Sequence, residues 1–401
     1  MIDTRLGHGL DIPKSRDERA RERFVSSLRA HVLTDVAESM KQAWEKDVLP
    51  AFRAEHERDP ANAGEVHAAL RPHPQFRFYS SLRCTAQEAV WNAVIDELDD
   101  DVDAFNRRCA EIAADQSRAQ GTLQLDPELE LPRSATAVDV HLMPGNYHGS
   151  SGSRGSDDAV AGAIYDNGLN VFAFGVMGEH LDDIGMSMSN FVRLRFPDLQ
   201  PEKILDVGCT IGHNTLPWKR TFPEAEVHGI DIAAPCLRYA HARAQALGET
   251  VHFHQQAAEA VDFPDASFDV VFSSMFLHEL PLKSIRAFLA EAHRVLRPGG
   301  VLINMELPPN SATTPYDGFY LDWDSYYNNE PYYKGFRDQD YKELCTGAGF
   351  AEDAFFEAVM PRYGYVDEDV FAGAIAADAA FDEDTGRLSD IIMWYGFGAR
   401  R

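Results

Sequence analysis

The sequence predicts an α/β protein in which a doubly wound, mostly parallel sheet follows an α-helical N-terminal region. From about residue 200 onward, short apolar runs alternate with amphipathic helical patterns, and such alternation is typical of a parallel sheet with helices on both faces. Before about residue 120, apolar residues recur instead at intervals of three or four, which indicates helices.

Three regions follow from this pattern. Residues 1–125 are interpreted as an α-helical accessory domain, and one of its helices is expected to begin at Thr85, because Thr85 and Glu88 have capping-box spacing. Pro, Gly and Ser accumulate in residues 126–160, which we interpret as a linker. Residues 161–401 form the expected α/β domain.

The elements of the α/β domain can be assigned in order from their apolar patterns. Strands are expected at 203–208, 226–231, 251–255, 268–274 and 301–307, with helices near 213–221, 235–247 and 283–296. Ligands of such sheets bind at the carboxyl ends of the strands.

Composition limits the classes of partner and compartment. Acidic residues outnumber basic ones by 64 to 37, a net charge of −27, so nucleic acid and membrane surfaces are poor candidate partners. Five scattered cysteines without a C-x-x-C pair argue against a disulfide framework or a structural metal site and favour a cytoplasmic protein. There is no signal-peptide pattern at the N-terminus and no apolar run near 18 residues. A homodimer is one assembly compatible with this sequence.

The stretch "ILDVGCTIGHNT", residues 204–215, reads as a buried strand followed by a glycine turn. A dinucleotide-binding turn would place glycines at 208, 210 and 213, but Thr210 and His213 occupy two of these positions. The pattern D-x-G-x-G-x-G fits better, since Asp206, Gly208 and Gly212 match it and only Thr210 departs.

That turn resembles the first motif of class I S-adenosylmethionine-dependent methyltransferases. Three more stretches strengthen the resemblance: Asp231 at the end of the second strand in "HGIDIA", "AAEAVDFPDASFDVVFSS" at 257–274, and "HRVLRPGGVLI" at 293–303. The resemblance covers roughly residues 160–401. It is nearest the small-molecule branch that includes ubiquinone and menaquinone methyltransferases.

The resemblance implies a Rossmann-like sheet of seven strands, with the last strand antiparallel and formed by residues 391–399, and it implies S-adenosylmethionine as cofactor. Asp231 would bind the ribose hydroxyls, Asp206 would orient the amino group, and the glycines would let the backbone approach the methionine end. Binding is expected to survive the Thr210 departure. The remaining cofactor residues would be Tyr165, in a "YD" motif, the adenine-loop residues Ala258 and Glu259, with Asp262 as an alternative, and Ser273.

Catalysis would be an in-line displacement at a sulfonium methyl group, for which alignment of the reactants supplies most of the rate. His278 and Glu279 follow the fourth strand toward the expected site and are the candidate catalytic pair. A surface or helix-capping pair is the alternative for them. The acceptor atom, O, N, C or S, is left open.

An insertion at residues 311–338 is expected to act as a lid. Its segment 316–336 is dense in aromatic residues and carboxylates, with Lys334 as its only base, and we expect a loop that overhangs the strand ends. Such a lid favours a neutral or cationic small-molecule acceptor. The alternative is packing on the helical domain. The expected substrate contacts are Tyr320, Trp323, Tyr327 and Tyr333.

Two other functions are compatible with these motifs. The chain could bind the cofactor without transferring a methyl group and work through its helical domain, or it could use S-adenosylmethionine for another reaction. The glycine turn and Asp231 favour cofactor binding in all three cases.

Overall fold

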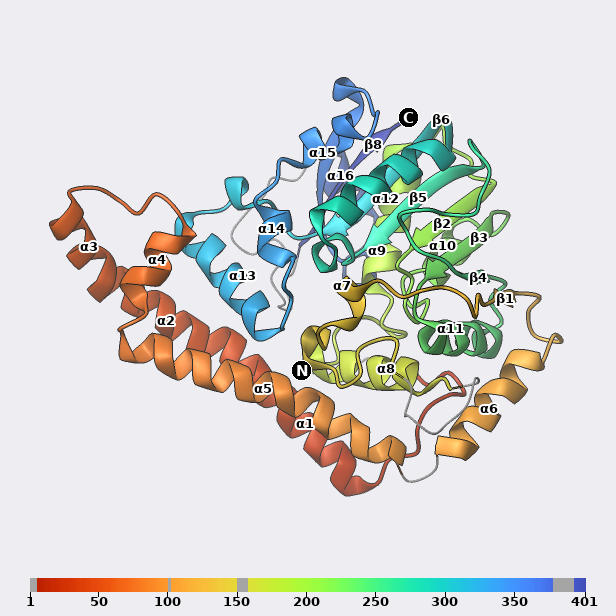
Figure 1. Cartoon of the computed structure of the whole chain (residues 1–401), viewed down its shortest axis with the longest axis horizontal. Coiled ribbons are helices and arrows are strands. Elements are labelled where there is room, and N and C mark those ends of the chain that lie inside the picture. The colour runs from red at the N-terminus through yellow and green to blue at the C-terminus, as the bar shows by residue number, and fades with distance from the viewer. Residues whose placement is uncertain (1–5, 100–101, 150–157, 378–392) are drawn as a thin grey trace.

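The computed structural model describes residues 6–99, 102–149, 158–377 and 393–401. Its N-terminal helices form an elongated arm beside an α/β body (Figure 1), and α1 lies alongside α5, which also packs against α8. α1 begins at a capping box made by Ser15 and Glu18. The helices of the arm are α1 (Arg16–His31), α2 (Ala37–Ala43), α3 (Leu49–His56), α4 (Ala63–Leu70) and α5 (Pro74–Asp99), with π-helical turns η1 (Val32–Val36) and η2 (Trp44–Val48) between the first three. The next helix, α6 (Val102–Ala114), packs instead against α11 (Ala234–Leu247) of the body.

The helix expected to begin at Thr85 begins eleven residues earlier, at Pro74. Thr85 lies inside α5, and its hydroxyl donates a hydrogen bond to the carbonyl oxygen of Ser81. The capping-box interpretation was therefore wrong, because this bond to the preceding turn uses the hydroxyl that a cap would need.

One sheet of eight strands forms the body, in the order β1-β4-β3-β2-β5-β6-β8-β7. Neighbours from β1 to β6 pair in parallel, and β8 runs antiparallel to both β6 and β7. The strands are β1 (Thr122–Gln124), β2 (Lys203–Val207), β3 (Glu226–Asp231), β4 (His252–Gln255), β5 (Phe268–Ser274), β6 (Leu296–Glu306), β7 (Phe355–Met360) and β8 (Trp394–Arg400).

The α/β fold class and the antiparallel last strand are confirmed, but the number of strands differs from the seven expected. The additional strand is β1, which lies within the range assigned to the helical domain and pairs Thr122 with His252 at the edge of the sheet. Residues 391–392 of the expected last strand lie outside the described residues. The division into domains stays a prediction.

Helices cover both faces of the sheet because neighbouring strand residues point in opposite directions. On β2, Ile204 belongs to a core cluster with side chains of α9 (Asp183–Arg195), α10 (Leu216–Thr221), α11 and α16 (Glu368–Ala376), whereas Leu205 belongs to a second cluster with α12 (Leu282–Val295) and α15 (Tyr341–Gly347). The chain runs outward from β2 through β3 to β4 and then returns to β5. The carboxyl ends of β2 and β5 therefore meet at the switch point where such sheets bind ligands.

Segment 316–336 is helical rather than the expected loop. Thr314 caps α13 by accepting a hydrogen bond from the Asp317 backbone N–H, with Pro315 in the first turn, and α13 packs against α4 and α5. The other elements are α7 (Arg133–Thr136), η3 (Val140–Leu142), α8 (Val160–Phe172), η4 (Leu277–Glu279), η5 (Asn310–Ala312), α13 (Pro315–Tyr327), α14 (Tyr333–Arg337), η6 (Glu352–Ala354) and η7 (Tyr363–Tyr365). Of the helices in the described ranges, none has the length and apolar character needed to cross a membrane.

Alanine substitution at Gly398 of β8, with Gly373 of α16 as the control, tests how tightly β8 is packed between its neighbours. A Cβ at Gly398 would overlap the Leu302 carbonyl oxygen of β6, whereas a Cβ at Gly373 in α16 would meet nothing within 4 Å. We expect Gly398→Ala to lower the free energy of unfolding by about 1–3 kcal/mol or more. Gly373→Ala should instead raise it by up to about 1 kcal/mol. Chemical denaturation of both variants checks this, and equal stability of the two would contradict the enclosure of β8.

Candidate functional site

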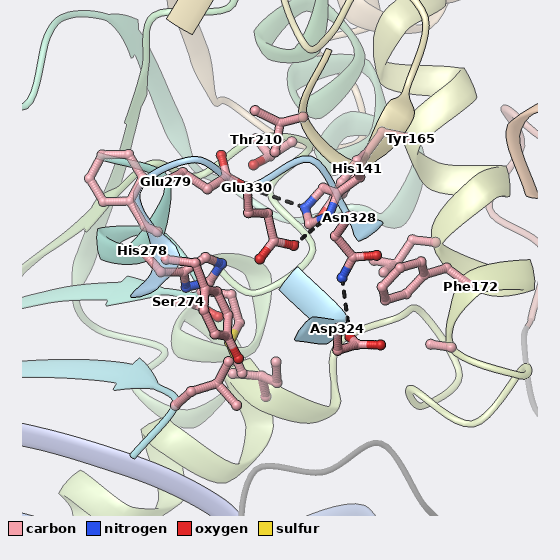
Figure 2. Close-up of a pocket in the computed structure, with 18 of the residues that line it drawn as sticks. His141, Tyr165, Phe172, Thr210, Ser274, His278, Glu279, Asp324, Asn328 and Glu330 are labelled. Atoms are coloured by element: carbon pink, nitrogen blue, oxygen red, sulfur yellow. Dashed lines mark hydrogen bonds and ion pairs between the residues drawn. The ribbon is translucent and has the colours of Figure 1, made fainter. Parts of the chain in front are cut away.

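A cavity of about 590 Å³ opens at the carboxyl ends of β2, β3 and β5. Its other walls come from α1 and α2, residues 134–148, α8, and the α13–α14 segment. Figure 2 shows His141, Phe172 of α8 and Asp324 of α13 among the side chains that gather around it. Eight of the residues predicted from the sequence line it: Tyr165, Asp206, Gly208, Asp231, His278, Glu279, Tyr320 and Tyr333.

Four predicted cofactor residues, Gly212, Ala258, Glu259 and Ser273, are not among the residues that line the cavity. Ala258 is buried in the core beside Val261, and the Ser273 hydroxyl donates to Asn304 Oδ1 in the interior. Strand alternation explains the last case, because the next residue, Ser274, does line the cavity.

Trp323 and Tyr327, two of the predicted substrate contacts, also lie away from the cavity and line a surface hollow with Phe76. The Trp323 indole N–H donates to Ser80 Oγ at 2.9 Å, and the indole ring stacks on Tyr326 at 4.9 Å between ring centres. These two residues pack on α4 and α5, which is the alternative considered for this segment.

The carboxylates of this segment have partners that the sequence did not indicate. Arg83 Nε lies 2.5 Å from Asp324 Oδ1, and Arg337 Nη1 lies 3.0 Å from Asp322 Oδ1. His141 Nδ1 lies 3.0 Å from Glu330 Oε1. The premise that Lys334 is the only counter-charge was therefore wrong, and so the acidic segment no longer argues for a neutral or cationic acceptor.

The glycine turn holds Asp231 in place through backbone groups. Asp231 accepts hydrogen bonds from the N–H groups of Thr210 at 2.9 Å and Ala233 at 2.8 Å. Thr210 adopts the left-handed conformation, with φ of 48°, that the missing glycine would adopt without strain. The Thr210 backbone N–H therefore still reaches the Asp231 carboxylate although a threonine replaces the motif glycine. Burial raises the pKa of Asp231 to about 6.

Asp206 and His213 lie beside this turn as uncharged groups. Burial raises the pKa of Asp206 to about 8, and its carboxyl accepts a hydrogen bond from Thr215 Oγ1 at 2.5 Å. Burial lowers the pKa of His213 to about 3. His213 Nδ1 is buried with no hydrogen-bond partner among the described residues, and His213 lines the cavity. A ligand group could satisfy this orphaned atom.

His278 forms a buried pair with Glu306. Its Nδ1 lies 2.6 Å from Glu306 Oε2, while Glu306 Oε1 accepts the backbone N–H groups of Phe276 and Leu277. Burial by itself lowers the pKa of His278, but the attraction of Glu306 and the hydrogen bond to it raise this pKa to about 9. His278 is therefore protonated at neutral pH.

His141 bridges two carboxylates, Glu279 of η4 and Glu330 after α13, as the dashed lines in Figure 2 mark. Its Nε2 lies 3.3 Å from Glu279 Oε1, which also accepts the Tyr147 hydroxyl at 2.9 Å, and its Nδ1 faces Glu330. Burial by itself lowers the pKa of His141, but the two carboxylates raise it to about 10. His141 has a φ of 58°, and such left-handed residues concentrate at functional sites.

Gln87 of α5 joins this bridge to the N-terminal helices. Its amide N–H donates to the His141 carbonyl oxygen at 2.7 Å, and its Oε1 accepts from Arg29 Nη1 and Arg83 Nη1, each at 3.0 Å. Sequence reasoning missed His141 and Arg29, which lie in the regions assigned to the linker and the accessory helices. Of the cavity residues that sequence reasoning missed, Ser274 could have been predicted, because it alternates onto the same face of the sheet as Asp206 on the neighbouring strand.

The glycine turn makes a prediction about backbone conformation. A Cβ at Gly208, where φ is 78°, would overlap the Phe276 ring, so Gly208→Ala should lower the free energy of unfolding by about 1–3 kcal/mol. Thr210→Gly removes left-handed strain but adds chain entropy to the unfolded state, and should stay within about 1 kcal/mol of the wild type. Denaturant titration checks both, and a reversed order of stability would contradict this description of the turn.

The His278–Glu306 pair makes a prediction about proton binding. Since the folded-state pKa of His278 is about 9 and an unfolded histidine titrates near 6.5, the pair stabilises the fold fully below about pH 6.5, and that contribution is lost as the pH rises to about 9. Glu306→Gln should lower the pKa of His278 from this value, because burial remains while the nearest counter-charge is lost and only the more distant Glu279 and Glu330 still raise the pKa. NMR titration of the imidazole measures this. A His278 pKa that is the same in the variant and the wild type would contradict the pairing.

Comparison with known proteins identifies part of the chain. A family model described as a methyltransferase domain matches residues 204–300. Over 109 residues the chain is 38% identical to demethylmenaquinone methyltransferase of Thermus thermophilus. This match covers 27% of this chain and 49% of that protein. Over 103 residues it is 40% identical to malonyl-[acyl-carrier protein] O-methyltransferase of Hahella chejuensis, covering 26% of this chain and 36% of that one. The chain thus spans about half or less of the length of these relatives.

Solved structures resemble the chain more loosely. Phosphoethanolamine N-methyltransferase 2 of Haemonchus contortus, solved with S-adenosyl-L-methionine, matches 53% of this chain and 52% of its own, with 18% identity and a TM-score of 0.36. A SAM-dependent methyltransferase of Aquifex aeolicus matches 55% of this chain and 94% of its own, with 17% identity and a TM-score of 0.34. The family assignment therefore rests on the sequence match, which covers the glycine turn and the strands that follow it. Residues 204–300 of this chain belong to the class I S-adenosylmethionine-dependent methyltransferase family.

Proposed function

We propose that this protein is an S-adenosylmethionine-dependent methyltransferase with a small-molecule acceptor. The observation that carries the proposal is a single cavity lined both by the glycine turn with Asp231 and by titratable and aromatic side chains from outside the sheet edge. The first wall suits the cofactor, and the second offers a place for an acceptor. A concave cavity of this volume fits a small molecule better than a macromolecular surface.

The residues at the sheet edge fit S-adenosylmethionine. The Asp231 carboxylate would accept hydrogen bonds from the ribose hydroxyls, since its backbone N–H partners at Thr210, Ala233 and Ile232 do not use up the acceptor sites of its two oxygens. Asn214 Nδ2 donates to His213 Nε2 at 3.2 Å, so neutral His213 carries its proton on Nδ1, and this orphaned N–H suits an acceptor such as the cofactor carboxylate. Tyr165 would cover the cofactor from α8, and its ring centre lies 5.7 Å from that of His213. The bound cofactor supplies an electrophilic sulfonium methyl group.

His278 and Glu279 would have different roles at the acceptor. Because the pKa of His278 is about 9, its protonated ring is a donor at neutral pH and has no free site for another proton. Burial by itself raises the pKa of Glu279, but hydrogen bonding to His141 and further contacts bring it below the ordinary value. Glu279 is therefore the member of the pair that would accept a proton when the acceptor loses one. Tyr320 and Tyr333 would flank the acceptor.

Transfer itself is tested by incubating the protein with methyl-labelled S-adenosylmethionine and an extract of the source cell. Mass spectrometry should identify a small molecule that gains the label only when protein is present. If S-adenosylhomocysteine binds but no labelled product forms under varied conditions, the chain is a binding protein of methyltransferase fold. Conversion of the cofactor without methyl transfer would instead indicate another reaction.

Asp231 allows a direct test of the cofactor. We expect S-adenosylhomocysteine to raise the melting temperature, and Asp231→Asn to weaken its binding by about 1.5–3 kcal/mol. Wild-type affinity should fall as the pH drops through about 6, because the protonated carboxyl loses its acceptor capacity, and the variant should lack this dependence. Asp198→Asn, an exposed acid-to-amide change, is the matched control. Stabilisation by NAD without stabilisation by S-adenosylhomocysteine would contradict the cofactor assignment.

A further inference from the structure

Arg29 of α1 places a fixed guanidinium at the cavity wall. Its side chain lines the cavity, and the residue is only 1% exposed. Nε donates to the Phe172 carbonyl oxygen at 2.8 Å, Nη1 donates to Gln87 Oε1 at 3.0 Å, and the guanidinium carbon lies 3.7 Å from the centre of the Phe172 ring. These contacts hold the group in one orientation without neutralising its charge.

No carboxylate of the described residues forms an ion pair with Arg29. The nearby carboxylate, Asp324, pairs with Arg83, and Arg83 shares the Gln87 oxygen with Arg29. Two guanidinium groups thus face one carboxylate. Burial and then repulsion from Arg83 lower the pKa of Arg29 to about 9. A buried cation without a counter-ion is costly to the fold, and an anion bound beside it would offset that cost.

The other charged groups that line the described part of the cavity have a net negative charge, but none of them forms an ion pair with Arg29. His278 is balanced by Glu306, and His141 lies between Glu279 and Glu330, a group with one net negative charge. The remaining charged side chains that line the cavity away from the sheet edge are Asp35, Glu38 and Lys41 of η1 and α2.

Arg29 lies on the side of the cavity away from the glycine turn. On α8, Tyr165 contacts His213 of the turn, whereas Phe172 contacts Arg29. Tyr165 and Phe172 are seven positions apart on α8, a rise of about 10 Å along the helix axis. The surroundings of Arg29 are therefore the expected acceptor side, where Phe172 and Tyr320 offer apolar surfaces.

We propose that Arg29 binds a carboxylate of the methyl acceptor, so that the acceptor is a small carboxylic acid with an apolar or aromatic body. Two N–H groups of a guanidinium match the two oxygens of a carboxylate. This inference rests on the proposed function and deepens it, because it names the class of acceptor. It replaces the neutral or cationic acceptor expected from the sequence. The carboxylate is an anchor for recognition, whichever atom receives the methyl group.

The test uses the whole chain saturated with S-adenosylhomocysteine and measures calorimetric affinities for two acid–amide pairs, benzoate with benzamide and hexanoate with hexanamide. At least one acid should bind the wild type roughly tenfold or more tightly than its amide. Arg29→Gln should abolish that preference, and Arg29→Lys should retain part of it. Arg23→Gln, which removes an exposed charge from the same helix, should leave it unchanged.

Two results would overturn the inference. One is a wild type that binds the amides as tightly as the acids, and this comparison decides the question even if Arg29→Gln does not fold. The other is a tenfold loss of S-adenosylhomocysteine affinity in Arg29→Gln, which would assign Arg29 to the cofactor carboxylate. A wild type that fails to bind S-adenosylhomocysteine would overturn the proposed function itself, and the first titration of the series registers that outcome separately.

Discussion

The buried amide of Gln87 is the constraint on which the helical half of the cavity depends. Gln87 is fully buried, and its oxygen accepts from Arg29 and Arg83 while its nitrogen donates to the His141 carbonyl oxygen. A single side chain thus fixes α1 against α5 and holds His141 between two carboxylates. Because a buried amide left without partners is costly, these groups are expected to keep their positions together, and Arg83 extends the same network to Asp324 of α13.

The sheet supplies the other half by a different physical means. Parallel strands end at one edge, and there the left-handed turn at Gly208 and Thr210 directs a backbone N–H to Asp231. The geometry of this sheet-edge half of the cavity is determined mainly by local backbone conformation and by the order of the strands. The helical half needs contacts between residues far apart in the chain, such as Arg29 with Gln87. Under the proposed function, cofactor and acceptor would occupy these separate parts of one cavity.

This difference explains what could be predicted from the sequence. The strands around the site and the placement of Gly208 and Asp231 follow from periodicity and short motifs, because neighbouring residues determine them. Trp323 lies away from the cavity because α13 turns that face toward α4, and no local pattern indicates which face of a helix meets a distant partner. His141 reaches the site through a left-handed residue in a region of Gly and Pro, where periodicity gives no signal. The short edge strand at Thr122 depends equally on a distant partner, β4.

The central claim is that one cavity holds the cofactor at the sheet edge and the acceptor beside Arg29 and His141. A crystal structure of the whole chain with S-adenosylhomocysteine tests it most directly. The account predicts ribose hydroxyls within hydrogen-bond distance of Asp231, and a thioether sulfur that faces the open part of the cavity beside Arg29. S-adenosylhomocysteine bound elsewhere, or with its carboxylate on Arg29, would contradict the account.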